Sequence, residues 1–186
     1  EKEIEWSDAG LDGSFRFLSR VWRIVDNWTE TIAGEGVGHA DGDESFSAAE
    51  RSLRRKTHDT IRRVTTDIEQ RQQLNTAVSA LMELVNELYT FSEQTVTGGP
   101  SRRNDEDVEH AGQVERPETI HVVRDALEAL VRMLSPFAPH MCEEMWEALG
   151  YSGGLAGATW PEFDPAVAKA EEVEIPIQIN GKVRAH

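Results

Sequence analysis

The stretch LDGSFRFLSRVWRIVDNWTETI, residues 11–32, decides the class of fold that the chain can adopt. Apolar side chains recur in it every three or four positions, which predicts an amphipathic helix. They are Leu11, Phe15, Leu18, Val21, Trp22, Val25, Trp28 and Ile32. Phe17 and Ile24 widen the apolar face past half of the circumference. We therefore expect this helix to be enclosed between neighbouring elements.

Further helices are predicted after residue 32. The sequence Ser-Ala-Ala-Glu at 47–50 matches a capping box, in which the serine and glutamate side chains satisfy free backbone amides at a helix start. Pro117 and Pro139 suit the first turn of a helix, and Gly150 suits a helix end. These helices are expected at about residues 47–72, 75–91, 117–135 and 139–150.

The helix pattern predicts one all-α domain. Helices of this length joined by short or floppy connections pack as antiparallel neighbours, so we expect an up-down bundle of about five helices over residues 11–150. An entry segment, 1–10, precedes it. Residues 92–116 lack apolar periodicity and carry many charges, which indicates a mobile acidic linker within the bundle.

The last part of the chain is expected to begin a β-hairpin. A connecting loop, 151–172, leads to residues 173–186, where apolar residues alternate and Asn180–Gly181 supplies a turn. The chain lacks an initial methionine and stops within the second strand. We therefore expect a piece of a longer protein that ends in a truncated hairpin.

The composition restricts the setting of the protein. A formal net charge of −15 argues at first against nucleic acid, but acidic residues crowd the predicted loops while arginines crowd two predicted helices. Arginine (15) outnumbers lysine (4), which fits either a high-salt source or an ordinary acidic protein. No signal peptide or membrane span is present, and the lone Cys142 excludes an internal disulfide. We expect a cytoplasmic monomer without a membrane partner.

The first predicted helix carries a candidate nucleic-acid surface. Arg16, Arg20 and Arg23 are spaced by four and three residues, so their guanidinium groups lie on one ridge about 10 Å long. Such a ridge can meet several phosphates of a nucleic-acid backbone. The alternative is a solvated face, or a face paired with the acidic loops.

The second predicted helix and the hairpin supply further candidates. Arg54, Arg55 and Arg62 lie on the side of the helix opposite its apolar stripe. Lys182 and Arg184 follow the hairpin turn. Arg71 is different because it falls on the apolar stripe, where a buried arginine needs a partner; Glu83 on the third helix is the expected one.

Catalytic motifs are missing from the sequence. It contains no glycine-rich phosphate loop, no nucleophile elbow and no paired metal motif. His140 and Cys142 stand two residues apart, but tetrahedral zinc requires four ligands and no second pair is found. We therefore predict no catalytic, cofactor-binding or metal-binding residue in this chain.

Several motifs resemble a known family. They are SFRFLSRVW at 14–22, LRRKTH at 53–58, DIEQR at 67–71, LNTA at 74–77, MLSPFAPH at 133–140, EMW at 144–146, WP at 160–161 and QINGKVR at 178–184. In this order they resemble the helical anticodon-binding domain of leucyl-tRNA synthetases of the bacterial type. Asn-Thr-Ala and Asn-Gly-Lys-Val-Arg favour leucine over the related valine, isoleucine and methionine enzymes. The long acidic segment 95–116 departs from the family pattern.

The resemblance implies a class I synthetase that charges tRNA(Leu) with leucine using ATP and Mg²⁺. The catalytic, editing and C-terminal domains of the same polypeptide would be partners, and this chain alone would be inactive. The helical domain would contact the tRNA body rather than depend on anticodon bases. Two alternatives stay open: the equivalent domain of a valyl, isoleucyl or methionyl enzyme, and a helical protein-interaction module with acidic loops. An independent enzyme is disfavoured by the missing motifs.

Overall fold

The chain folds as a helical bundle, as the apolar periodicity predicts. The computed structural model describes residues 8–34, 45–95, 116–169, 177–179 and 182–185. Its main helices are α1 (Asp8–Gly34), α2 (Ala48–Thr66), α3 (Leu74–Thr95), α4 (Pro117–Leu134) and α5 (Pro139–Ala148). Shorter elements are η2 (Asp67–Arg71), η3 (Leu155–Gly157), α6 (Pro165–Ala168), β1 (Ile177–Ile179) and β2 (Lys182–Ala185).

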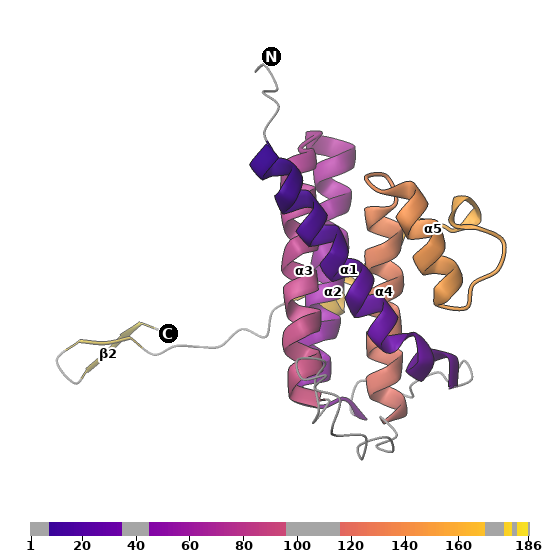
Figure 1. Ribbon diagram of the computed structural model, residues 1–186. Coiled ribbons are helices and arrows are strands. Elements are labelled where there is room, and N and C mark those ends of the chain that lie inside the picture. Colours follow the sequence, from indigo (N-terminus) through magenta and orange to yellow (C-terminus); the bar gives the residue numbers. More distant parts are fainter. Residues whose placement is uncertain (1–7, 35–44, 96–115, 170–176, 180–181, 186) are drawn as a thin grey trace.

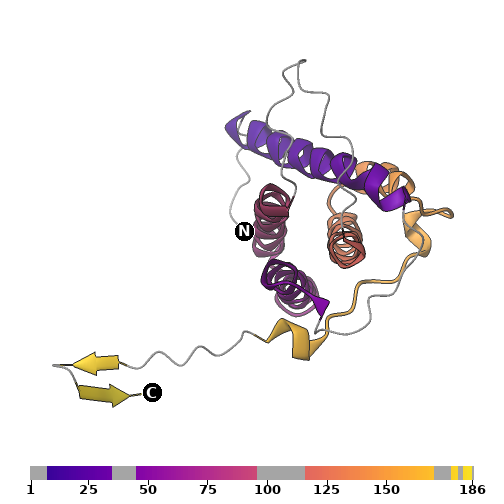
Figure 2. The same cartoon turned by 90° about the horizontal axis from the view of Figure 1, so that it is seen from below.

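The helices form layers around α3 and α4. Figure 2 shows α1 lying across one side of α3 and α4, while α2 lies on their other side. α2 and α3 run antiparallel, since Ser52 contacts Glu87 while Lys56 contacts Glu83. α1 crosses the bundle obliquely and reaches α5 (Figure 1). The central pair of helices is thus covered from both sides.

The core lies where the sequence places it on α3 and α4. All the predicted inner residues of α3 are buried: Ala77, Ala80, Leu81, Leu84, Leu88 and Phe91. The predicted apolar half of α4 is buried as well: Val122, Val123, Ala126, Leu127, Leu130, Val131, Met133 and Leu134. Burial of this apolar surface is the main stabilising contribution to the fold.

The expectation that α1 is enclosed was wrong. Leu11, Phe15 and Trp22 remain 56%, 72% and 43% exposed, whereas Val21, Ile24 and Val25 are buried. The reason is that α1 lies on the outside of the bundle and packs on one side only (Figure 2). The exposed apolar side chains Leu11, Phe15 and Trp22 are not covered by any described part of the chain.

The expected boundary of the acidic linker was also wrong. α3 continues to Thr95, so residues 92–95 are helical rather than part of a linker. Ser92 is buried, and its hydroxyl accepts a hydrogen bond of 3.1 Å from the Trp28 indole N–H. This contact joins the last part of α3 to α1. α1 likewise begins at Asp8, within the expected entry segment, and residues 96–115 lie outside the described part of the chain.

Arg71 does not occupy the buried position that its spacing predicts. The last turn of α2 widens into the π-helical turn η2, which closes one residue later than an α-turn and rotates the following side chains. The Arg71 side chain is therefore 61% exposed, and its Nη1 lies 3.2 Å from Asp67, which is buried. Glu83, the expected partner, instead pairs with Lys56 and Arg63 at 2.7 and 2.6 Å.

The segment after α5 returns to the bundle instead of merely connecting it to the hairpin. The Trp160 indole donates to the Thr65 hydroxyl at 2.8 Å, and the Asp164 amide donates to His58 Nδ1 at 2.9 Å. β1 and β2 then pair antiparallel, with Ile179 opposite Lys182 and a register shift between Ile177 and Gln178. The predicted turn at 180–181 lies outside the described residues.

Glu50 ties the starts of α2 and α4 together. The capping box is confirmed, because the Ser47 amide donates to Glu50 Oε2 at 2.6 Å and the Glu50 amide donates to Ser47 Oγ at 3.2 Å. The Thr119 hydroxyl also donates to Glu50 Oε1 at 2.6 Å. Burial raises the pKa of the Glu50 carboxyl, but the hydrogen bonds from Thr119 and Ser47 and the charge of Arg116 outweigh it. The net effect holds the pKa of Glu50 below its usual value.

Replacing Glu50 by glutamine is expected to lower the free energy of unfolding by about 1–3 kcal/mol at neutral pH, because a buried charge-assisted cap is lost. The lowered pKa means that this contribution is present above the unfolded-state value of 4.5 and is lost as pH falls through the folded-state pKa. Urea unfolding of both proteins at neutral and acidic pH measures the difference. Glu93→Gln, on the exposed side of α3, is the control. A difference that persists unchanged at low pH would contradict this assignment.

Candidate nucleic-acid interface

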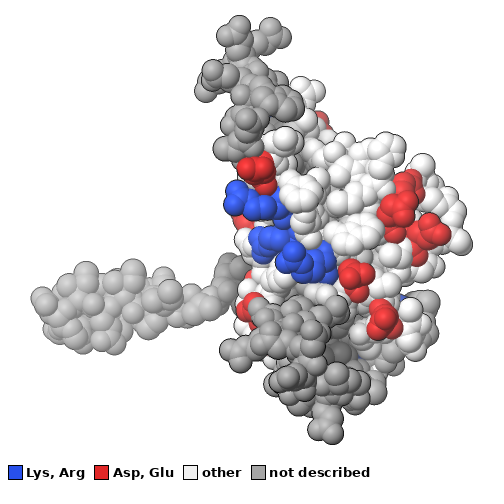
Figure 3. Space-filling model, viewed as in Figure 1, with Lys and Arg blue, Asp and Glu red and all other residues white. Residues whose placement is uncertain are grey.

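The strongest candidate surface is the arginine ridge of α1, formed by Arg16, Arg20 and Arg23. Figure 3 shows the basic side chains gathered in one strip over α1. Arg16 and Arg23 are exposed and Arg20 is partly exposed. Arg16 and Arg23 lie away from the buried side of α1, which carries Val21 and Ile24, whereas Arg20 lies at its edge and contacts α3. The predicted ridge is therefore present and open to solvent.

The partners of the arginine ridge are uncharged groups. Arg16 Nε donates to the Asp12 carbonyl at 3.3 Å, and Arg20 Nη2 donates to Asn86 Oδ1 at 2.8 Å. The Arg20 guanidinium also lies over the Tyr89 ring, 4.8 Å from its centre. Within residues 8–34, 45–95 and 116–169, no carboxylate pairs with any ridge arginine. The positive charge of the ridge is thus not neutralised by these parts of the chain.

The basic side chains of α2 are arranged differently. Arg62 pairs with Asp59 at 2.6 Å. Arg55 lines a pocket of about 300 Å³ together with Asp59 and Glu87. The Arg54 guanidinium lies over the Phe46 ring, 4.7 Å from its centre. Most of the basic charge on α2 therefore lies beside acidic groups.

Glu83 on α3 pairs with two of the basic side chains of α2. Hydrogen bonds from Arg63 and then Lys56 are the main causes that lower the pKa of Glu83 to about 2. Glu83 accepts from Arg63 Nη1 at 2.6 Å and from Lys56 Nζ at 2.7 Å. A phosphate approaching here would have to displace a carboxylate, which the ridge on α1 does not require.

The predicted tRNA-binding arginines of α1 and α2 do not form one surface. α1 and α2 lie on opposite sides of α3 and α4 (Figure 2), so the arginine ridge is separated from Arg54, Arg55 and Arg62. The side chains of Lys182 and Arg184 lie outside the described part of the structure. Among the described candidates, the structure therefore brings together Arg16, Arg20 and Arg23 and leaves Arg54, Arg55 and Arg62 apart from them.

Sequence reasoning did not identify Asn86 and Tyr89 as part of this surface. Both belong to α3, and the Tyr89 hydroxyl donates to the Arg20 carbonyl at 3.0 Å. Their positions in the sequence are typical of an ordinary polar helix face, and only the packing of α1 on α3 brings them to Arg20. Such a contact between residues 66 positions apart has no local sequence signal.

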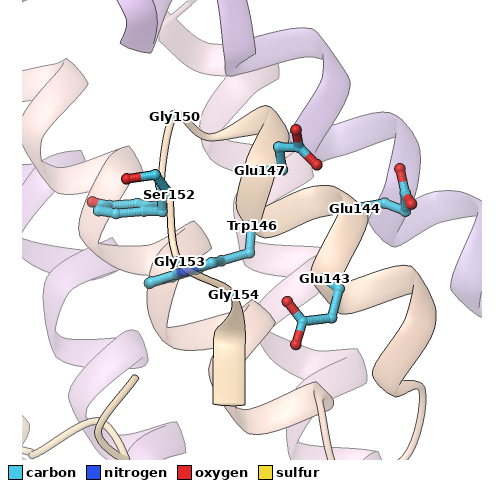
Figure 4. A pocket seen from close by; sticks show the side chains of 9 residues that line it. Glu143, Glu144, Trp146, Glu147, Gly150, Ser152, Gly153 and Gly154 are labelled. Atoms are coloured by element: carbon cyan, nitrogen blue, oxygen red, sulfur yellow. The ribbon is translucent and has the colours of Figure 1, made fainter. Parts of the chain in front are cut away.

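A pocket of about 480 Å³ beside α5 is acidic and does not suit an RNA backbone. Figure 4 shows Glu143, Glu144 and Glu147 along the helix side of this pocket. The Trp146 and Tyr151 rings stack with their centres 4.1 Å apart, and Glu143 Oε2 accepts from the Leu155 amide at 2.7 Å. These contacts shape the loop after α5.

Cys142 is not poised as a nucleophile. It is fully buried, and burial together with the nearby charge of Glu143 raises its pKa to about 12. The thiol is therefore protonated at neutral pH, and its role is that of a small apolar group. His140 stands exposed at the start of α5. None of the described helices is long and apolar enough to cross a membrane.

Comparisons with known proteins place the chain in a family. A sequence model described as the anticodon-binding domain of tRNA ligase matches residues 50–186. The leucine–tRNA ligase of Geobacter sp. (strain M21) is 41% identical over 185 residues, which cover 100% of this chain and 20% of that protein. The leucine–tRNA ligase of Syntrophus aciditrophicus (strain SB) is 42% identical over 186 residues, covering 100% and 19%. The chain thus spans about a fifth of the length of these relatives.

A solved structure shares the fold. It is the ternary complex of the Agrobacterium radiobacter K84 agnB2 LeuRS with tRNA and LeuAMS, which matches with a TM-score of 0.70 and 28% identity over 97% of this chain and 20% of that chain. The helical architecture and the ordered motifs therefore point to the same relatives, and the resemblance seen in the sequence is confirmed. The chain belongs to the family of anticodon-binding domains of tRNA ligases, and its relatives are leucine–tRNA ligases.

Proposed function

We propose that this chain is the tRNA-binding helical domain of a leucine–tRNA ligase and that it positions tRNA(Leu) through phosphate contacts of Arg16, Arg20 and Arg23. The observation that carries the proposal is the arginine ridge, whose described partners are neutral groups. Guanidinium groups form strong, geometrically specific bonds with phosphate. The related LeuRS structure contains tRNA, which supports this class of ligand.

Phosphate contacts fix register and orientation but carry no base sequence. The proposed role is therefore to position the tRNA for leucylation, which would use ATP and Mg²⁺ in parts of the longer relatives outside this region. The catalytic, editing and C-terminal parts of such a protein, acting as a cytoplasmic monomer, would be its partners. The relatives favour the leucine enzymes over the valine, isoleucine and methionine enzymes.

The net charge of −15 does not contradict a local phosphate site. Screening by salt reduces interactions between exposed charges to a range of about 8 Å at physiological ionic strength. The acidic residues elsewhere weaken long-range attraction, so we expect slow encounter but effective close contacts.

Changing Arg16, Arg20 and Arg23 together to alanine is expected to weaken binding of tRNA(Leu) by about 10- to 100-fold, because three charge-assisted contacts are lost. The slope of log affinity against log salt should fall by somewhat under one for each lost phosphate contact, about 0.7–0.9. Filter binding at graded salt measures both quantities. The melting temperature should fall only slightly, since Arg16 and Arg23 are exposed and only Arg20 contacts α3.

The matched control places the same loss of charge on α2. Arg54, Arg55 and Arg62 are changed together to alanine, which alters the net charge equally on the opposite side of the bundle (Figure 2). We expect a salt slope close to that of the unaltered chain. Equal losses in both triple variants would show that overall charge, rather than the ridge, governs binding. Unchanged tRNA binding in the ridge variant would contradict the proposal.

The 186-residue chain is expected not to support leucine-dependent pyrophosphate exchange. The physical reason is the lack of a phosphate-cradling loop in the sequence. A full-length leucine–tRNA ligase from Geobacter, assayed in parallel, is the positive control. Exchange above the enzyme-free background by the purified chain would contradict the expectation.

A further inference from the structure

We propose that Asn86 and Tyr89 of α3 are positioning residues that hold the Arg20 guanidinium ready for a tRNA phosphate. This inference rests on the proposed function, because it assigns Arg20 as the pre-organised centre of the arginine ridge. Arg20 lies between Arg16 and Arg23 along the ridge, and two contacts from α3 fix it. Each contact restrains the side chain without cancelling its charge.

The contact with Asn86 is neutral. Asn86 Oδ1 accepts from Arg20 Nη2 at 2.8 Å. A guanidinium has five N–H donors, so this bond leaves most of them for a ligand. A carboxylate in the same place would neutralise the charge and compete with phosphate, as Glu83 does for Arg63. The amide therefore orients Arg20 and preserves its attraction for an anion.

The contact with Tyr89 restrains the position of the guanidinium. The Arg20 Cζ lies 4.8 Å from the centre of the Tyr89 ring. The ring is itself anchored, because its hydroxyl donates to the Arg20 carbonyl at 3.0 Å. The aromatic ring attracts the guanidinium without occupying its N–H donors, which stay available to a phosphate.

The neighbouring arginines lack this support. Arg16 is exposed and uses Nε to reach the Asp12 carbonyl at 3.3 Å, close to the limit for a hydrogen bond. Arg23 is exposed, and no partner is found for it among the described residues. Both must lose side-chain freedom when they bind an anion, whereas Arg20 has lost part of its freedom already. Arg20 should therefore contribute most to phosphate binding.

The first experiment measures binding of tRNA(Leu) at graded salt to Asn86→Ala and Tyr89→Leu, in the unaltered chain and in Arg20→Ala. Either α3 variant should bind about 2- to 12-fold more weakly, with an unchanged salt slope because every charge is retained. In the Arg20→Ala background neither change should have a further effect. Tyr89→Phe, which keeps the ring but loses the hydroxyl, should bind between the unaltered chain and Tyr89→Leu.

The second experiment separates positioning from a merely structural tie between α1 and α3. Asn86→Asp creates an ion pair with Arg20, so a structural tie would be kept or strengthened. We expect the opposite for tRNA, with binding weaker than in Asn86→Ala because the carboxylate competes with phosphate. Gln94→Glu and Gln94→Ala, on an exposed position of α3, are the matched controls for charge and for truncation.

The outcomes distinguish this inference from the proposed function. If Arg20→Ala weakens binding while Asn86→Ala and Tyr89→Leu bind as the unaltered chain does, the positioning role is overturned and the proposed function stands. If the α3 variants weaken binding equally with and without Arg20, they act through the fold and the inference fails. If the triple ridge variant itself binds normally, the proposed function fails, and the inference with it.

Discussion

The packing of α1 across α3 and α4 is the contact on which the candidate surface depends. Apolar residues of α1 such as Val21 and Ile24 are buried there, and polar contacts fasten the helix along its length. The Trp28 indole donates to Ser92, and Arg124 Nη2 donates to the Ile32 carbonyl at 2.7 Å near the end of the helix. With this side committed, the remaining side of α1 must face solvent. The arginine ridge is exposed for that reason.

The same packing gives the basic side chains of α1 and those of α2 different surroundings. On α2, basic side chains such as Arg62 and Arg63 lie against carboxylates of their own helix or of α3. Exposed pairs of this kind add little stability and leave little net field. On α1, the contacts of Arg16 and Arg20 are a carbonyl, an amide and an aromatic ring. In the proposed function, the local balance of charge rather than the total of −15 would decide where a phosphate binds.

The sequence predicted the helices, their core residues on α3 and α4, and the Ser47–Glu50 cap, because each depends on spacing within a short segment. It failed where a distant neighbour decides the outcome. Trp22 belongs to an apolar stripe, but periodicity cannot tell which part of a wide stripe is covered. Arg71 was misplaced because a π-helical turn breaks the assumed period. The ridge was visible as a pattern, whereas the support of Arg20 by α3 was not.

Contacts to phosphates alone cannot distinguish one RNA sequence from another, because every RNA has the same backbone chemistry. A ridge that meets only phosphates can therefore only fix where the RNA lies and how it is oriented. Position is useful only if the ridge is stiff. α1 is a helix of 27 residues, about 40 Å long, and it packs on α3 and α4, so the backbone of the ridge is held by the bundle. Their remaining freedom lies in the side chains, and the α3 contacts remove part of it at the centre of the ridge. Stiff backbone and restrained guanidinium together would convert a sequence-independent attraction into a fixed orientation of the bound RNA.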